Sequence, residues 1–152
     1  MEGSEILTEG LRNWKLRIIL SAILCIMGLA GLVSMVIGIF INLSIYDKSM
    51  VSIAIWMVGI PTYLILSGLS RVTPSTIAQF INENNGQIDQ DLQILLQPDT
   101  ELNEHLKSKK SELIAFFQDQ PLYTFLPDKP VKQAYFLMLV SMLVSFGIWI
   151  IT

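Results

Sequence analysis

Few residues of this chain combine the type and the spacing that chemistry requires. The segment INENNGQIDQDL, from Ile81 to Leu92, places Glu83, Asn85 and Asp89 around a glycine in the manner of a calcium-binding EF-hand loop. Its first ligand position is Ile81, however, and Leu92 stands where the loop needs a bidentate carboxylate. Because both anchoring ligands are missing, we interpret the segment as a polar turn between two helices.

The other reactive side chains are isolated in the sequence. His105, the only histidine, stands on a predicted acidic helix with no second metal ligand nearby. Cys25, the only cysteine, lies in an apolar run, so neither a disulfide framework nor a cysteine metal site is available. Phosphate-loop, dinucleotide-binding, nucleophile-elbow and zinc-protease motifs are absent. We therefore expect no catalytic residue, metal, cofactor or enzyme activity; a membrane-embedded enzyme would need catalytic groups such as Asp89, Asp91 and His105.

The chain is unusually apolar, because 52% of its 152 residues are hydrophobic and 15% are charged. The apolar residues fall into three blocks, each long enough to cross the ~30 Å hydrocarbon layer of a bilayer as a helix. The first block is too long for a cleaved signal peptide. We therefore predict an all-α integral membrane protein with three transmembrane helices. The predicted order is a cytoplasmic N-terminal segment (1–17), transmembrane helix 1 (18–46), a tight turn (47–49), transmembrane helix 2 (50–70), a cytoplasmic-side helical insert (71–131) and transmembrane helix 3 (132–152).

Small residues recur at regular spacing in the first predicted span, although a lipid-facing anchor has no need of them. Lipid supplies no hydrophobic drive between helices, so close backbone approach and polar pairing must hold them together. We therefore predict a helix-packing face that either docks a partner helix or seats the second and third spans of the same chain. The face comprises Gly28, Ala30, Gly31, Ser34, Gly38 and Asn42.

The second predicted span carries Gly59 and Pro61 near its middle, and the proline should kink the helix there. The three apolar blocks contain no acidic, basic or histidine residue, which proton relays and ion sites normally require; they are Ile18–Tyr46, Met50–Ser70 and Ala134–Thr152. Three helices are also few for enclosing a pathway. The alternative function is a homo-oligomeric channel or small-solute transporter, with the kink and the polar residues Ser34 and Asn42 lining its pore.

The polar insert is predicted to form three short amphipathic helices. The first begins with Thr73 as its cap and Pro74 at its first helical position. Apolar spacing predicts the second helix at 88–97 and the third at 100–119, with Asp99 as the cap of the third. Such a core is thin, so we expect these helices to pack on one another, on the membrane surface or on a partner. The candidates for partner contact are Leu92, Leu96, Leu106, Leu113 and Phe117.

Basic residues predict the orientation of the spans. Arg12, Lys15 and Arg17 precede the first span and Arg71 follows the second, whereas Lys48 stands alone on the other side. Because basic loops stay on the cytoplasmic side, the N-terminus and the insert should face the cytoplasm, stroma or matrix, and the C-terminus the opposite side. We expect the membrane to be a bacterial inner, thylakoid or inner mitochondrial membrane.

These features together predict a non-catalytic accessory subunit or assembly factor of a larger integral-membrane complex. It would act by helix packing in the membrane and by contacts of its cytoplasmic-side helices. Its expected partners are other integral membrane subunits and the lipid bilayer. A net charge of −3 gives no reason to expect nucleic acid, and no small-molecule substrate is evident.

Overall fold

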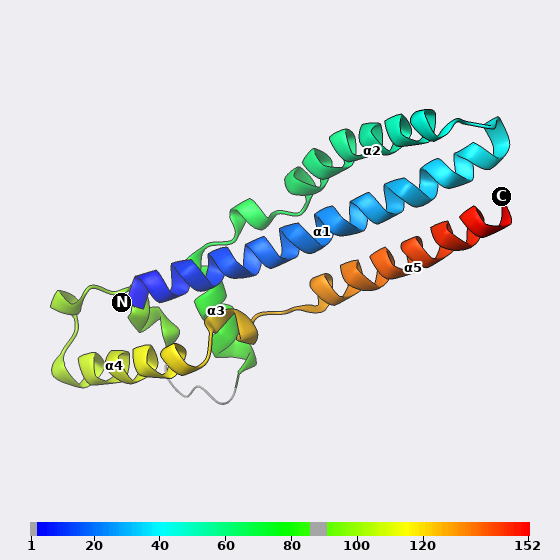
Figure 1. Cartoon of the computed structure of the whole chain (residues 1–152). Helices are drawn as coiled ribbons and strands as arrows, with labels where there is room; N and C mark the ends of the chain where they lie inside the picture. Colours follow the sequence, from blue (N-terminus) through cyan, green and yellow to red (C-terminus); the bar gives the residue numbers. More distant parts are fainter. Residues whose placement is uncertain (1–2, 86–90) are drawn as a thin grey trace. The chain divides into compact units, whose positions relative to one another are not determined.

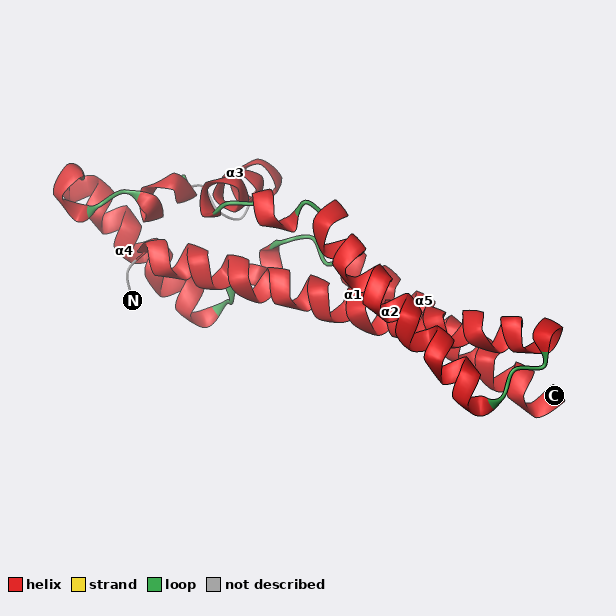
Figure 2. Cartoon of the chain, turned by 90° about the horizontal axis from the view of Figure 1, so that it is seen from above, coloured by secondary structure: helices red, strands yellow, loops and turns green. Residues whose placement is uncertain are grey.

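The computed structural model describes residues 3–85 and 91–152, and within these residues every regular element is helical (Figures 1 and 2). Three elements are long and apolar enough to cross a membrane: α1, α2 together with the short turn that follows it, and α5. The all-α prediction and the prediction of three candidate spans are confirmed at this level. The α-helices are α1 (Gly3–Ile41), α2 (Ile45–Leu66), α3 (Pro74–Asn84), α4 (Glu104–Asp119) and α5 (Lys129–Ile151). The 3-10 helices are η1 (Leu69–Arg71), η2 (Leu92–Leu96), η3 (Asp99–Glu101) and η4 (Leu122–Phe125).

The chain divides into two compact units. The insert unit consists of Met1–Leu16 and Leu69–Asp128, and the apolar unit consists of Arg17–Gly68 and Lys129–Thr152. Helix α1 contributes its first turns to the insert unit and the rest of its length to the apolar unit. The predicted boundary at residue 17 therefore falls between the two units, and α1 crosses it without a break.

The tight turn predicted at 47–49 is wrong. The loop lies at 42–44 instead, where Asn42 adopts a φ of 53° after α1 and Ser44 caps α2. The Ser44 hydroxyl accepts a hydrogen bond from the Asp47 backbone N–H at 3.1 Å and donates one to the Asp47 carboxylate at 2.7 Å. The bond to the Ser44 hydroxyl satisfies one orphan N–H of the first helical turn, so Asp47 to Ser49 continue into α2 rather than turning away from it.

Helix α2 also ends earlier than residue 70. Its C-cap is Ser67, and Gly68 follows with a φ of +67°, a left-handed conformation that glycine adopts without strain and that commonly ends helices. Pro61 lies inside α2 as predicted and leaves the carbonyl of Met57 without its usual donor. The predicted kink stays a prediction.

The first predicted helix of the insert is confirmed, whereas the second and third differ from expectation. α3 begins at Pro74 behind the Thr73 cap, and its Ile77 and Ile81 are buried. The predicted helix at 88–97 is wrong in kind, because its described part is the 3-10 helix η2; residues 86–90 lie outside the described residues, together with the central turn of the EF-hand-like segment.

Side-chain bonds explain the short form of η2. The Asn82 side-chain oxygen accepts from the Leu92 backbone N–H at 3.0 Å, and its amide nitrogen donates to Asp91 at 2.7 Å. Asp91 in turn caps η2 by accepting from the Gln93 backbone N–H. The third predicted helix starts later than expected, because Asn103, rather than Asp99, caps α4 through the Leu106 N–H at 2.8 Å.

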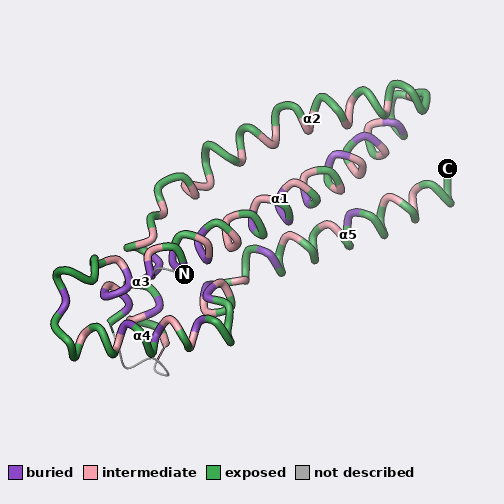
Figure 3. Tube along the Cα trace, turned by 60° about the vertical axis from the view of Figure 1, so that its left-hand side comes forward, coloured by how far each residue is buried: buried purple, intermediate pink, exposed green. Residues whose placement is uncertain are grey.

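The insert unit has a larger core than the insert residues alone could form, because α1 contributes buried residues to it (Figure 3). Leu7 is fully buried, and two glycines let α1 approach its neighbours closely. A Cβ on Gly10 would lie 2.5 Å from Leu122 Cδ2, and a Cβ on Gly3 would lie 2.8 Å from the Leu95 carbonyl oxygen. The core cluster consists of Ile6, Leu7, Leu11, Ile77, Ala78, Ile81, Leu92, Leu95, Leu113, Phe117, Leu122 and Leu126.

Two polar contacts hold the start of α1 to the rest of the insert unit. The Trp14 indole N–H donates to the Pro127 carbonyl at 2.9 Å, and the Lys15 ammonium donates to the Val72 carbonyl at 2.9 Å. These bonds reach the two ends of the insert, where the chain enters it and leaves it. The prediction of a thin core is therefore wrong, because the N-terminal segment is part of the core of the insert unit.

Three of the five residues predicted to contact a partner are buried in this core. Leu92, Leu113 and Phe117 are buried inside the insert unit, with exposed fractions of 0%, 4% and 7%. Leu96 and Leu106 are half-buried. The assignment of the three buried residues to a partner surface is wrong, because they belong to the core of the insert unit itself.

Truncation of Leu7 tests the shared core. We expect Leu7→Ala to destabilise the insert unit by about 2–5 kcal/mol, because it removes a fully buried side chain. Backbone hydrogen exchange in α3 and α4 of the full-length protein should accelerate accordingly. The control Arg12→Ala changes an exposed residue of the same helix and should leave exchange unaltered. Unchanged exchange in Leu7→Ala would show that α1 is no part of this core.

Lys110 joins two short elements of the insert unit to α4. Its ammonium donates to the Gln97 carbonyl and to the Asp99 carboxylate, both at 2.9 Å, and the residue is buried. The hydrogen bond and positive charge of Lys110 lower the pKa of Asp99 below its usual value of 3.8.

This ion pair should make the stability of the insert unit depend on pH in the acidic range. Because the pKa of Asp99 is depressed in the folded protein, its contribution is present above pH 3.8 and is lost as the pH falls through the folded pKa. Asp99→Asn should therefore lower the melting temperature slightly at pH 7, and the difference from wild type should shrink at lower pH. A difference that stays constant from pH 7 to pH 3 would contradict this role of the pair.

Candidate functional site

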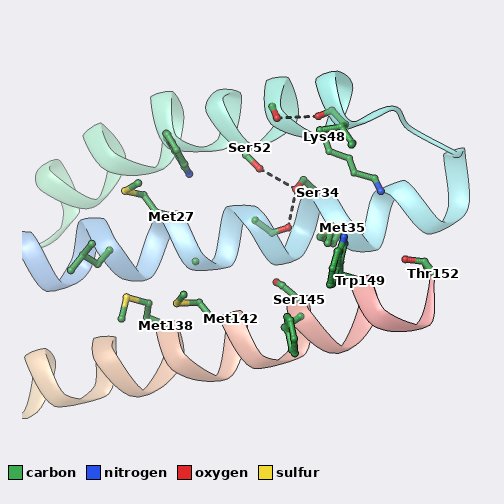
Figure 4. Close-up of a pocket in the computed structure, with 17 residues that line it drawn as sticks. Met27, Ser34, Met35, Lys48, Ser52, Met138, Met142, Ser145, Trp149 and Thr152 are labelled. Atoms are coloured by element: carbon green, nitrogen blue, oxygen red, sulfur yellow. Dashed lines mark hydrogen bonds between the residues drawn. The ribbon is translucent and has the colours of Figure 1, made fainter.

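The apolar unit contains an open groove of about 810 Å³ along α1, between α2 and α5 (Figure 4). Its floor is built by small residues of α1, because they leave room above the helix backbone. Its walls are apolar and contain several flexible methionines, with hydroxyl groups and one lysine among them. The groove is lined, among others, by Gly28, Gly31 and Ser34 of α1, by Lys48, Ser49, Ser52 and Trp56 of α2, and by Met138, Met142 and Ser145 of α5.

Helix α2 is seated on one line of small residues. The Ser52 hydroxyl donates to Ser34 Oγ at 3.0 Å and lies 3.3 Å from the Ala30 carbonyl oxygen. Ala30 and Ser34 are 0% and 4% exposed. Further along, a Cβ on Gly59 would lie 3.2 Å from Ile26 Cγ2. Ala30, Ser34 and Gly38 are spaced four residues apart and so lie along one side of α1. These small residues permit both the close approach and the polar pairing that helices need in lipid.

Helix α5 uses a different small residue. A Cβ on Gly28 would lie 3.3 Å from Met138 Cγ, so α5 packs close to α1 at this position. Ser141 of α5 is 2% exposed, and its hydroxyl donates to the Leu137 carbonyl of its own helix at 2.7 Å. The hydroxyl is therefore satisfied within α5 and makes no demand on a neighbour.

The six predicted face residues consequently have four different environments. Ala30 and Ser34 contact α2, and the Lys48 side chain of α2 lies against Gly38, while Gly28 contacts α5. Asn42 lies beyond the end of α1, in the loop, and is exposed. Gly31 alone is open, because a Cβ there would meet no atom within 4 Å. The interpretation as a seat for the chain's own helices therefore accounts for four residues, and it leaves Gly31 open.

One end of the groove is positively charged. Lys48 lines the groove beside Ser49. Its backbone N–H donates to the Ser44 carbonyl at 3.0 Å, but within the described residues its ammonium makes no hydrogen bond or ion pair. The last turn of α1, which includes Gly38, offers it the partial negative charge of a helix C-terminus. Trp56 also lines the groove, and its Nε1 is buried without an acceptor. Both groups are donors, so the groove is suited to an occupant that brings acceptors.

Sequence reasoning missed Lys48, because it assigned this residue to a turn at the membrane surface. The available signal was the Ser44–Asp47 spacing, which begins a helix and so places Lys48 in its first turn. Among the described residues, no three carboxylate, thiol or imidazole side chains gather as a metal site would require. The groove offers hydroxyl, indole and ammonium donors, which provide hydrogen bonding and pairing with an anion.

No protein-family model, curated protein or solved structure matches this chain. The groove geometry therefore carries the functional argument alone.

The contact between Ser34 and Ser52 can be measured with a double-mutant cycle. We expect Ser34→Ala and Ser52→Ala to be coupled by about 0.6 kcal/mol in the free energy of unfolding in mixed detergent–SDS micelles, a typical value for interhelical hydrogen bonds. Ser49→Ala is the control, because the Ser49 hydroxyl donates to the Ile45 carbonyl of its own helix at 3.0 Å. A coupling no larger between Ser34 and Ser52 than between Ser34 and Ser49 would contradict the α1–α2 seat.

Proposed function

We propose that this chain is a non-catalytic accessory subunit or assembly factor of a larger integral-membrane complex, and that it binds a transmembrane helix of a partner in the groove of the apolar unit. The observation that carries the proposal is the open position at Gly31. This glycine lies between the α5 contact at Gly28 and the α2 contact at Ser34, yet nothing occupies the space above it. A helix needs such an opening for its backbone to come close.

The composition of the groove floor favours a helix over lipid chains. A lipid tail fills space beside any apolar surface, whereas small residues are useful only where a backbone must approach another backbone. The groove reaches from Leu24 to Met35 on α1. At 1.5 Å per residue this is roughly 16 Å, or about three turns, which is enough for a crossing helix.

The outer surfaces of the apolar unit are consistent with neighbours in a membrane. No residue of α2 is buried, and large apolar side chains such as Met57, Ile65 and Leu66 are 72–79% exposed. The bias of basic residues toward the N-terminus and the insert supports the proposed placement of both on the cytoplasmic, stromal or matrix side. A bacterial inner membrane or an inner organelle membrane fits this distribution.

The homo-oligomeric pore is disfavoured by the same geometry. The Ser34 hydroxyl donates to the Gly31 carbonyl and accepts from Ser52, so it is already engaged inside the chain. Asn42 lies in the loop beyond α1 rather than on the face of the helix. The polar stripe that would line a pore is therefore not assembled.

Filling the groove should release the partner without disturbing the fold. We expect Gly31→Ile to insert normally but to migrate at a lower mass than wild type on a native gel of mildly solubilised membranes, because the new side chain occupies the space of the partner helix. The matched control is Gly147→Ile, which makes the same change at a glycine of α5 that also meets no atom within 4 Å but does not line the groove.

The two variants separate the partner site from a general effect on insertion. Gly147→Ile should keep the wild-type migration, since both substitutions carry the same helix-propensity cost. If Gly31→Ile migrated with the full complex, the groove would not be the partner site.

A further inference from the structure

We propose that the helix bound in the groove carries an aspartate or glutamate within about one turn of the position of Lys48, and that this carboxylate pairs with the Lys48 ammonium. The inference rests on the proposed function and names the chemistry of the partner. It follows from the direction of the Lys48 side chain, from the absence of an acidic side chain of the apolar unit that pairs with it, and from the small residues of the groove floor.

The Lys48 side chain runs toward α1 rather than away from the bundle. A lysine near the end of an apolar helix usually extends toward water, where its charge is solvated. Here the side chain extends toward α1 (Figure 4). A Cβ on Gly38, in the last turn of α1, would contact Lys48 Cε and would lie 3.2 Å from Nζ. The ammonium is thus held against α1, at the end of the groove.

No acidic side chain of the apolar unit pairs with the Lys48 ammonium. Asp47 is the only acidic residue between 17 and 68 or between 129 and 152. Its carboxylate is bonded to Ser44, and adjacent residues on a helix do not face each other. The Gly38 carbonyl oxygen already accepts from the Asn42 backbone N–H at 3.1 Å. The partial negative charge at the end of α1 attracts the ammonium but leaves its three donors unbonded.

A helix that carries a carboxylate would match two features of the groove, the positive charge of Lys48 and the open position at Gly31. It would pair with Lys48 in surroundings of low dielectric, where a close charge pair adds to affinity and defines the register of binding. The same helix would place its backbone over Gly31. An anionic lipid headgroup could supply the charge, but its acyl chains would have no use for a floor of small residues. The geometry therefore favours an acidic helix as the occupant.

The test is site-specific crosslinking in the full chain, expressed in its own membranes. A photoreactive amino acid at Ser49, which lines the groove beside Lys48, should react with a transmembrane segment of another protein. Sequencing of the crosslinked peptide should find an aspartate or glutamate within a turn of the reacted residue. Lys48→Glu should lower the crosslink yield about tenfold or more, and changing the identified acid to lysine in the partner should restore it. Lys48→Arg should retain the yield within about twofold.

The alternative outcomes each overturn a defined part of the account. If Lys48→Glu leaves the yield unchanged while Gly31→Ile abolishes it, the partner helix stands and the charge pair is wrong. If the wild-type protein reacts only with phospholipid or with a second copy of itself, both the acidic helix and the proposed function are wrong. Recovery of the crosslink by the partner's charge reversal also shows that Lys48→Glu is folded and inserted.

Discussion

Helices in lipid associate only where their backbones can come close or their polar groups can pair, and this constraint governs how the small residues of α1 are divided. Ala30 and Ser34 pack against α2, which brings Ser52 within hydrogen-bonding distance of Ser34. Gly28 packs against Met138 of α5. Two helices cannot cover the whole face of a third, so a strip of α1 at Gly31 is left open, and the groove is the direct result.

The same helix makes the polar insert a folded unit. An insert of this length has few apolar residues, and it is completed by Ile6, Leu7 and Leu11 from the first turns of α1. α1 therefore contributes to the cores of both units. This arrangement has a consequence for function, because the leucines that an isolated insert would offer to a partner are consumed by its own core. The proposed partner site is therefore the groove of the apolar unit.

The parts of the fold that depend on local signals could be predicted from the sequence. The start of α3 follows from Thr73 and Pro74, and the three candidate spans follow from apolar length. The loop at 42–44 was missed because polar residues at 47–49 resemble a turn, while the Ser44–Asp47 cap that extends α2 over them is a finer signal. The helix at 88–97 was expected from apolar spacing alone, whereas bonds from Asn82 and Asp91 favour a 3-10 turn. Such contacts depend on tertiary structure, which periodicity does not encode.

The site was predictable in kind but not in detail. Spacing identified the small face of α1, yet which residues seat α2, which seat α5 and which stay open depends on how three helices meet. The role of Lys48 depended on the corrected start of α2 and on the direction of one flexible side chain across Gly38. Most of the predicted face proved to be internal packing, and the open position was visible only once its neighbours were placed.

The mass and composition of the wild-type protein, purified from its own membranes in a mild detergent and measured by native mass spectrometry, test the central claim most directly. The account predicts a particle that contains other integral membrane chains in a fixed ratio to this one. A monomer, or an assembly of this chain alone, would contradict it.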